Sequence, residues 1–83
     1  MYAVEFLPSA AKALAKLDRA VQLRVARQIE RLAVDPRGDA AKLRGDDAIW
    51  RARVGDYRIL YELEDDRLLV VVVRIGHRRD VYR

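Results

Sequence analysis

A change of hydrophobic period near residue 49 constrains the fold of this chain more than any other feature. Residues 50–54 alternate apolar side chains with arginines, which predicts a β-strand with one buried face. Gly55-Asp56 is typical of a tight turn, and residues 57–63 are expected to form the returning strand. Residues 67–75 are almost all apolar, as in a central strand buried on both faces. This half of the chain is therefore predicted to be an antiparallel meander of three strands.

The first half of the chain has helical periodicity after a short opening strand. Residues 2–7 are rich in strand formers, Pro8 ends that strand, and Ser9 is the expected N-cap of a first helix. Asp18 is expected to cap a second helix, which residues 35–38 end. Its apolar stripe is Val21, Val25, Ile29 and Leu32, and its basic stripe is Arg24, Arg27 and Arg31. Residues 40–47 are expected to be a connector.

The order of these elements predicts an α+β fold made of one domain, residues 1–83. A strand, a two-helix hairpin and the antiparallel three-stranded meander follow one another, and the helices pack on one face of the sheet.

Composition limits the classes of partner and compartment. The 83 residues carry a formal net charge of +4, which favours polyanionic partners such as nucleic acid or an acidic protein. There is no Cys, so a disulfide framework and a thiolate metal site are excluded. The longest apolar run, residues 68–73, is too short to span a membrane, and residues 1–7 lack the features of a signal peptide. We therefore expect a cytoplasmic protein without a membrane partner.

The turn at Gly55-Asp56 determines which side chains share a face of the sheet. It sets Arg53 opposite Arg58, so Arg51, Arg53 and Arg58 are expected to project from the face away from the helices. Directly opposed like charges destabilise a sheet, which favours an anionic ligand such as phosphate at this face. The alternative is a solvated face, on which Glu62 and Glu64 are partners of the arginines.

The basic segment after Gly76 is expected to lie beside these arginines. His77 is a candidate for proton transfer, although a single His is more often a surface or packing residue. Tyr82 has two roles that its position leaves open: a ring that anchors the tail, or a ring that stacks on a base and a hydroxyl that joins proton transfer. The sequence has no Gly-rich phosphate loop, metal-ligand cluster or Ser-His-Asp arrangement, so neither a metal nor another cofactor is expected.

Several stretches resemble the RelE family of bacterial toxins. Lys42-Leu43-Arg44-Gly45 is followed by residues 50–61 (WRARVGDYRILY), and residues 75–82 (IGHRRDVY) end the match. The opening residues 2–6 and Lys16-Leu17 fit the same family, so the resemblance covers essentially the whole chain. It implies the family fold of a strand, two helices and a three-stranded meander.

The resemblance also implies an mRNA endonuclease of a type II toxin–antitoxin system, which enters the ribosomal A site and uses no metal. The RNA's own 2′-hydroxyl attacks the phosphate, which leaves a 2′,3′-cyclic phosphate and a 5′-hydroxyl. Arg58 and Arg78 are expected to lie exposed in a cleft and to stabilise charge on the phosphate. The positions that match the family's catalytic residues are Arg51, Arg53, Arg58, Arg78 and Tyr82. The implied partner is an acidic antitoxin, with which the toxin is expected to form a heterotetramer.

One departure from the family pattern concerns the general base. Arg51 and Arg53 fall where well-studied members often carry Lys, and an Arg side chain keeps its proton and is a poor base. Either His77 or Tyr82 serves instead, or catalysis rests on positioning and electrostatics. The alternative function is that of a ParE-like toxin, which shares the fold but binds DNA gyrase without being an enzyme. A third alternative is a basic RNA-binding domain without a partner.

Overall fold

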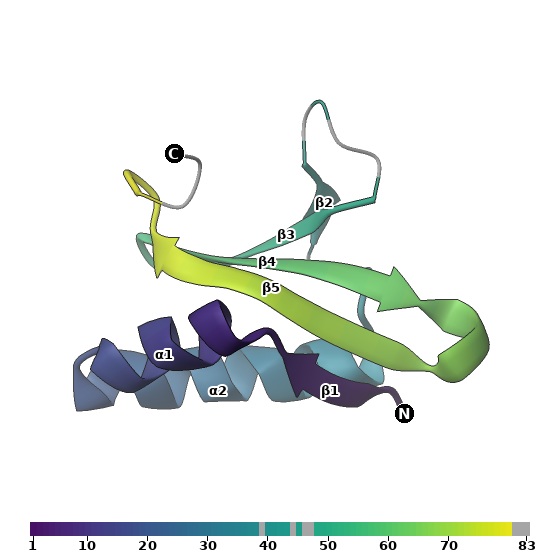
Figure 1. Cartoon of the computed structure of the whole chain (residues 1–83), viewed down its shortest axis with the longest axis horizontal. Coiled ribbons are helices and arrows are strands. Elements are labelled where there is room, and N and C mark those ends of the chain that lie inside the picture. Colours follow the sequence, from purple (N-terminus) through teal and green to yellow (C-terminus); the bar gives the residue numbers. More distant parts are fainter. Residues whose placement is uncertain (39, 44, 46–47, 81–83) are drawn as a thin grey trace.

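The computed structural model describes residues 1–38, 40–43, 45 and 48–80. In this part of the chain a strand precedes two helices, and further strands follow them (Figure 1). In chain order the elements are β1 (Ala3–Phe6), α1 (Pro8–Lys16), α2 (Arg19–Val34), β2 (Ala41–Lys42), β3 (Trp50–Val54), β4 (Tyr57–Glu64), the 3₁₀ turn η1 (Asp65–Arg67) and β5 (Leu69–His77). Neither of the described helices is long and apolar enough to cross a membrane.

The described strands form one sheet in the order β1-β5-β4-β3-β2. β3, β4 and β5 make the antiparallel meander that the sequence predicts, and both helices lie on one face of it (Figure 1). β1 pairs in parallel with β5, so the first strand of the chain lies beside the last one. The predicted α+β fold is confirmed.

The starts of the two helices follow from local chemistry. Pro8 opens α1, because its fixed φ suits the first helical turn and its missing N–H has no helical partner there. Leu7 before it is extended and is the N-cap, so the expectation that Ser9 caps this helix is wrong. Asp18 occupies the N-cap position of α2 as predicted, but its side chain makes no capping hydrogen bond. Its backbone carbonyl accepts the N–H of Gln22 at 2.9 Å.

The core lies between the sheet and the apolar stripe of α2. On that helix Val25, Ile29 and Leu32 are buried, whereas the predicted basic stripe is exposed. The buried strand residues of the same core cluster are Ala52, Val54, Ile59, Tyr61, Val70, Val72 and Ile75. In β3 and β4 the buried Ala52, Val54, Ile59 and Tyr61 alternate with residues that include arginines, so Arg51, Arg53 and Arg58 lie on the other face of the sheet.

Strand register fixes the direction of every side chain in the sheet. Between β3 and β4 the register is the predicted one, with Arg53 opposite Arg58. Between β4 and β5 it shifts, because Leu60 opposes Arg74 while Tyr61 opposes Val72. Val73 is therefore an extra residue on β5, which makes a β-bulge.

Three local expectations differ from the structure. Gly76 does not end the last strand: it pairs opposite Arg58, and β5 continues to His77 because the ladder with β4 extends that far. The turn before β5 is η1 followed by Leu68 with a φ of 47°, so the strand begins at Leu69 rather than at residue 67. The connector contains β2, which pairs with the start of β3.

Candidate phosphate-binding face

Arginines from neighbouring strands meet on the sheet face that points away from the helices. Arg53 and Arg58 are direct partners across β3 and β4, and Arg51 is two residues from Arg53 along β3. Residues two apart on a strand share a face, so the structure brings together the three arginines that the sequence selected. Arg53 is exposed and Arg51 is half-buried.

Arg58 is buried, with 9% of its surface exposed, so the expectation that it lies open in a cleft is wrong. Its Nη1 donates hydrogen bonds to the carbonyl oxygens of Gly55 at 3.1 Å and Tyr57 at 3.0 Å. These bonds tie the guanidinium to the turn of its own hairpin. Within the described residues no buried side-chain nitrogen or oxygen lacks a partner, so the remaining Arg58 nitrogens, Nε and Nη2, reach solvent. Arg58 is thus a largely buried cation whose Nη1 is held by its own turn.

A fourth arginine of this face, Arg74, was missed by the sequence prediction. The register places it on β5 opposite Leu60, which in turn opposes Arg51 on β3. Leu60 is buried although it lies outside the core cluster, a position that the apolar stems of flanking arginines are suited to cover. The bulge at Val73 is what turns Arg74 to this side. We call Arg51, Arg53, Arg58 and Arg74 the arginine face.

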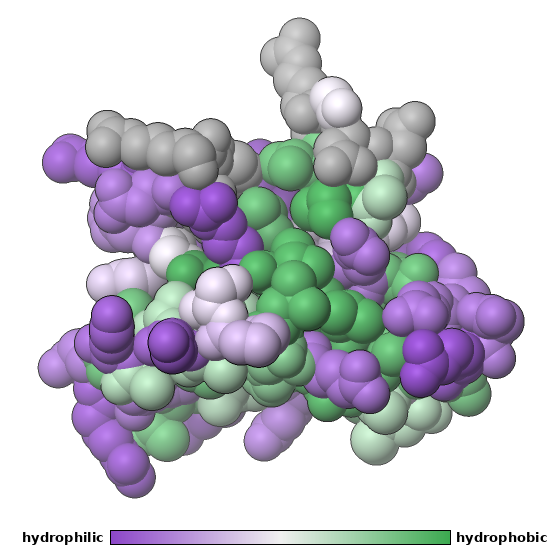
Figure 2. Space-filling model, viewed as in Figure 1, coloured by the Kyte–Doolittle hydropathy of each residue, from purple (hydrophilic) through white to green (hydrophobic). Residues whose placement is uncertain are grey.

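The start of the tail is attached to the same end of the sheet. The backbone N–H of Arg78 donates to the carbonyl of Asp56 at 2.8 Å, and Arg74 Nη2 donates to the carbonyl of Asp80 at 3.3 Å. The Arg78 side chain is exposed. Figure 2 shows hydrophilic residues gathered at this end of β5, at the left of the view. The tail therefore adds a basic side chain beside the arginine face.

Of the two candidates for proton transfer, His77 and Tyr82, only His77 lies within the described residues. His77 opposes Tyr57, and the two rings make an edge contact with centroids 5.6 Å apart. By register this pair leaves the sheet on the face opposite to Arg58. His77 Nδ1 accepts the backbone N–H of Arg79 at 3.2 Å, so Nε2 is the nitrogen left for proton transfer. Tyr82 lies outside the described residues.

The carboxylates that the solvated alternative requires do not pair with the arginine face. Glu64 pairs with Arg67 at 3.2 Å, and Glu62 is exposed. Among the residues described, no ion pair joins either carboxylate to Arg51, Arg53 or Arg58. No cluster of His, Asp or Glu suited to a metal ion occurs within residues 1–38, 40–43, 45 and 48–80. The chemistry available at this face is electrostatic, because guanidinium groups suit a phosphate.

The groups with shifted pKa values lie at the other end of the sheet. Asp65 accepts hydrogen bonds from Arg37 Nη2 and the Tyr2 hydroxyl, each at 2.7 Å, and these bonds hold its pKa below the ordinary value. We call Tyr2, Arg37 and Asp65 the Asp65 clasp. Nearby, the buried Tyr61 hydroxyl donates to the carbonyl of Pro36, and burial raises the pKa of Tyr61 to about 12. Both arrangements join distant parts of the chain rather than form a reactive site.

Comparisons with known proteins cover nearly the whole chain. The family model of the ParE toxin of type II toxin–antitoxin systems matches residues 4–82. A putative RelE-like toxin protein of Escherichia coli is 34% identical over 85 residues, which cover 98% of this chain and 90% of the relative.

Solved structures agree with this similarity. A chain of the intact E. coli RelBE toxin–antitoxin complex matches with a TM-score of 0.84 and 26% identity, covering 93% of this chain and 96% of that chain. A chain of the RelBE2 toxin–antitoxin complex of Mycobacterium tuberculosis matches with a TM-score of 0.83 and 32% identity, covering 93% and 98% respectively. The hairpin and the tail on which the family resemblance rested lie inside the matched range. The chain therefore belongs to the RelE/ParE family of toxins of type II toxin–antitoxin systems.

Proposed function

We propose that this toxin is a ribosome-dependent mRNA endonuclease that acts in the cytoplasm without a metal. The observation that carries the proposal is the arginine face, where Arg53 and Arg58 are direct cross-strand partners and the Arg78 backbone is attached at the same end. Such a concentration of guanidinium groups suits the backbone of an RNA strand. The similarity to RelE-like toxins supports the same function.

In the proposed reaction the 2′-oxygen of one nucleotide attacks the adjacent phosphorus, and the bond from phosphorus to the 5′-oxygen breaks. The attacking hydroxyl gives up a proton and the departing oxygen takes one up, so the products are a 2′,3′-cyclic phosphate and a 5′-hydroxyl. The phosphate oxygens gain negative charge in the transition state. Arg58 suits the stabilisation of this charge, because its Nη1 is already held by the turn and no reorientation is needed during the reaction.

Proton transfer is the part of the mechanism for which the arginine face is least suited. Arg51 and Arg53 supply positive charge rather than a base. We propose that most of the rate enhancement comes from positioning and electrostatic stabilisation. His77 leaves the sheet on the face opposite to Arg58, so the Tyr82 hydroxyl is the acceptor to be tested first. The role of Tyr82 stays a prediction from the sequence.

The second part of the proposal is an acidic antitoxin that forms a heterotetramer with this toxin. The two solved relatives named above are toxin–antitoxin complexes. On this chain, a hollow of about 370 Å³ between α1 and α2 is lined by apolar residues that include Phe6, Leu14 and Leu23. A partner helix with one apolar and one acidic face would fit this hollow and the net charge of +4.

Primer extension on translated mRNA after induction of the chain tests the proposal. New 5′ ends inside coding regions, absent when translation is blocked first, are the expected result. Intact transcripts together with trapped gyrase–DNA complexes would identify a ParE-like activity instead. A short acidic open reading frame beside the toxin gene is expected, and co-expression of its product should relieve growth arrest. Harmless expression of the toxin alone would contradict the toxin–antitoxin proposal.

A further inference from the structure

A second basic site lies between α2 and the end of β3. A hollow of about 300 Å³ there is lined by Arg24, Arg27, Gln28, Arg31, Arg53, Val54 and Gly55. We call it the helix hollow. It is separate from the apolar hollow between α1 and α2, and it shares Arg53 with the arginine face.

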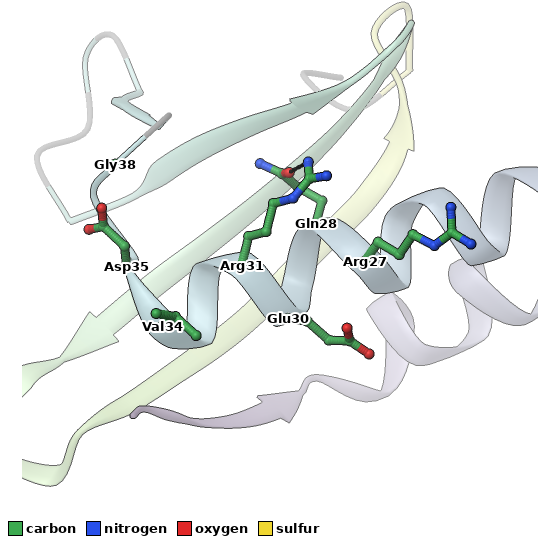
Figure 3. Close-up of a pocket in the computed structure, with 7 residues that line it drawn as sticks. All are labelled: Arg27, Gln28, Glu30, Arg31, Val34, Asp35 and Gly38. Atoms are coloured by element: carbon green, nitrogen blue, oxygen red, sulfur yellow. Dashed lines mark hydrogen bonds between the residues drawn. The ribbon is translucent and has the colours of Figure 1, made fainter.

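The fold directs the three helical arginines toward this hollow. They follow one another at spacings of three and four residues, which puts them along one side of α2 over about 10 Å. A Cβ atom placed on Gly55 would lie 3.0 Å from Arg24 Nη2, so the Arg24 guanidinium lies against the β3–β4 turn. Arg31 Nη1 donates to Oε1 of the buried Gln28 at 3.2 Å (Figure 3). Figure 3 draws a neighbouring hollow, which shares Arg27, Gln28 and Arg31 with the helix hollow and is also lined by Glu30 and Asp35. In this view Glu30 points away from Arg31 and Gln28.

No carboxylate lines the helix hollow, although four guanidinium groups do. In the described part of the chain, neither of the ion pairs involves Arg24, Arg27, Arg31 or Arg53. Like charges that line one hollow repel one another and raise the free energy of the folded protein. An anionic ligand would remove that cost.

The lining of the hollow favours nucleic acid over an acidic peptide. Interfaces with proteins need an apolar centre, whereas Val54 is the single large apolar residue among those that line this hollow. Interfaces with nucleic acid are polar and strongly basic, and Arg is suited to bidentate contact with phosphate. The hollow also continues from the arginine face through Arg53.

We infer that the helix hollow binds backbone phosphates of an RNA strand at a distance from the bond that is cleaved. This inference rests on the proposed function for the identity of the nucleic acid. The three helical arginines of the hollow, Arg24, Arg27 and Arg31, would anchor the RNA and would take no part in the chemistry. Loss of these helical arginines should therefore weaken RNA binding while the rate of cleavage at saturating RNA stays unchanged.

The test measures binding of a single-stranded RNA of about 12 nucleotides with methylated 2′-hydroxyls, so that cleavage plays no part. Arg27→Gln/Arg31→Gln removes two contacts, which should weaken binding by about tenfold or more near 0.1 M salt and lower the salt slope by about 1.4. Lys12→Gln/Lys16→Gln on the exposed side of α1 removes the same charge and should change binding by less than about threefold. Arg24→Gln/Arg27→Gln also removes two arginines but keeps the Arg31–Gln28 bond, so it separates loss of RNA contacts from loss of that bond. Thermal melts check that each variant is folded.

Equal losses of RNA affinity in the hollow variants and in Lys12→Gln/Lys16→Gln would overturn the inference, because net charge alone would then explain binding. It would also be overturned if the wild-type chain does not bind the RNA, or if the hollow variants lose affinity for a polyglutamate peptide but not for RNA. The inference stands if hollow variants lose RNA affinity even when induction leaves translated mRNA intact, which would refute only the proposed function. Cleavage of mRNA with unchanged RNA affinity in the hollow variants would refute only the inference.

Discussion

The two ends of the sheet differ in how their charges are paired. Near the β4–β5 turn, Arg37 pairs with Asp65 at 2.7 Å and Arg67 pairs with Glu64 at 3.2 Å. Near the β3–β4 turn, none of the described arginines of the arginine face or the helix hollow pairs with a carboxylate. The arginines near the β4–β5 turn are therefore neutralised by carboxylates of the same chain, whereas those near the β3–β4 turn can interact with solvent or a partner.

This difference separates residues that serve the fold from residues that serve binding. Unpaired like charges across strands destabilise a sheet, so the β3–β4 end lowers the stability that the core supplies. Arg58 belongs to both groups, because its Nη1 bonds to the turn while its other nitrogens reach solvent. Substitutions at the two ends should therefore affect activity and stability in different proportions.

Arg58→Ala should have the largest effect on activity. Loss of one charge-stabilising donor is expected to lower the single-turnover cleavage rate about a hundredfold, or roughly 3 kcal/mol of barrier. The bonds to the carbonyls of Gly55 and Tyr57 are lost as well, which should cost about 1–3 kcal/mol of folding free energy. Cleavage assays and thermal melts measure the two effects. Arg67→Ala, in the turn between β4 and β5, is the control and should leave the cleavage rate unchanged. An Arg58→Ala protein that is inactive because it is unfolded would contradict a catalytic role.

Arg78→Ala should lower the rate by a similar factor, about a hundredfold, without loss of stability. The side chain is exposed, and the bond from this residue to Asp56 uses the backbone N–H, which Ala retains. Equal melting temperatures with a large loss of cleavage are the expected result. A normal cleavage rate would remove Arg78 from the proposed site and leave Arg58 as its main phosphate donor.

The sequence predicted those parts of the fold that depend on local pattern. Alternation in residues 50–54 and the Gly55-Asp56 turn were enough to give the register of β3 and β4, and hence the pairing of Arg53 with Arg58. The parallel pairing of β1 with β5 joins segments that are far apart in the sequence, since Ala3 is the partner of Leu69. No local signal encodes such a contact.

The candidate site was predicted only in part, because two of its features depend on packing. The β-bulge at Val73 turns Arg74 to the arginine face, and nothing in a run of valines indicates which residue leaves the ladder. The burial of Arg58 results from bonds to the carbonyls of its own turn, which alternation alone does not reveal. The helical basic stripe was visible in the sequence, but its approach to Gly55 required the packing of α2 on β3.

Tyr61→Phe should alter stability and leave activity unchanged, the reverse of Arg78→Ala. The Pro36 carbonyl loses its buried donor, which should cost about 1–3 kcal/mol and lower the melting temperature by about 4–8 °C for each kcal/mol. Burial raises the pKa of Tyr61 from 10 to about 12, so its contribution is complete below pH 10 and is lost as the pH rises toward 12. Urea unfolding at neutral and alkaline pH should show a steeper alkaline decline for wild type than for Tyr61→Phe. Parallel declines would show that this hydroxyl is not the titrating group.

Asp65→Asn should have the smallest effect, because the Asp65 clasp is exposed to solvent and surface ion pairs contribute little to stability. The bonds from Arg37 and then Tyr2 lower the pKa of Asp65 below 3.8, so its stabilising contribution is present above that pH. As the pH falls through the lower pKa of the folded protein, the contribution is lost. The free energies of unfolding of wild type and Asp65→Asn should therefore differ at neutral pH and converge in acid. Asp66→Asn, the exposed neighbour, is the matched control and should follow wild type throughout. A gap between wild type and Asp65→Asn that stays constant into acid would show that the clasp does not act through the Asp65 charge, and the contrast between the two ends would then rest on the arginines alone.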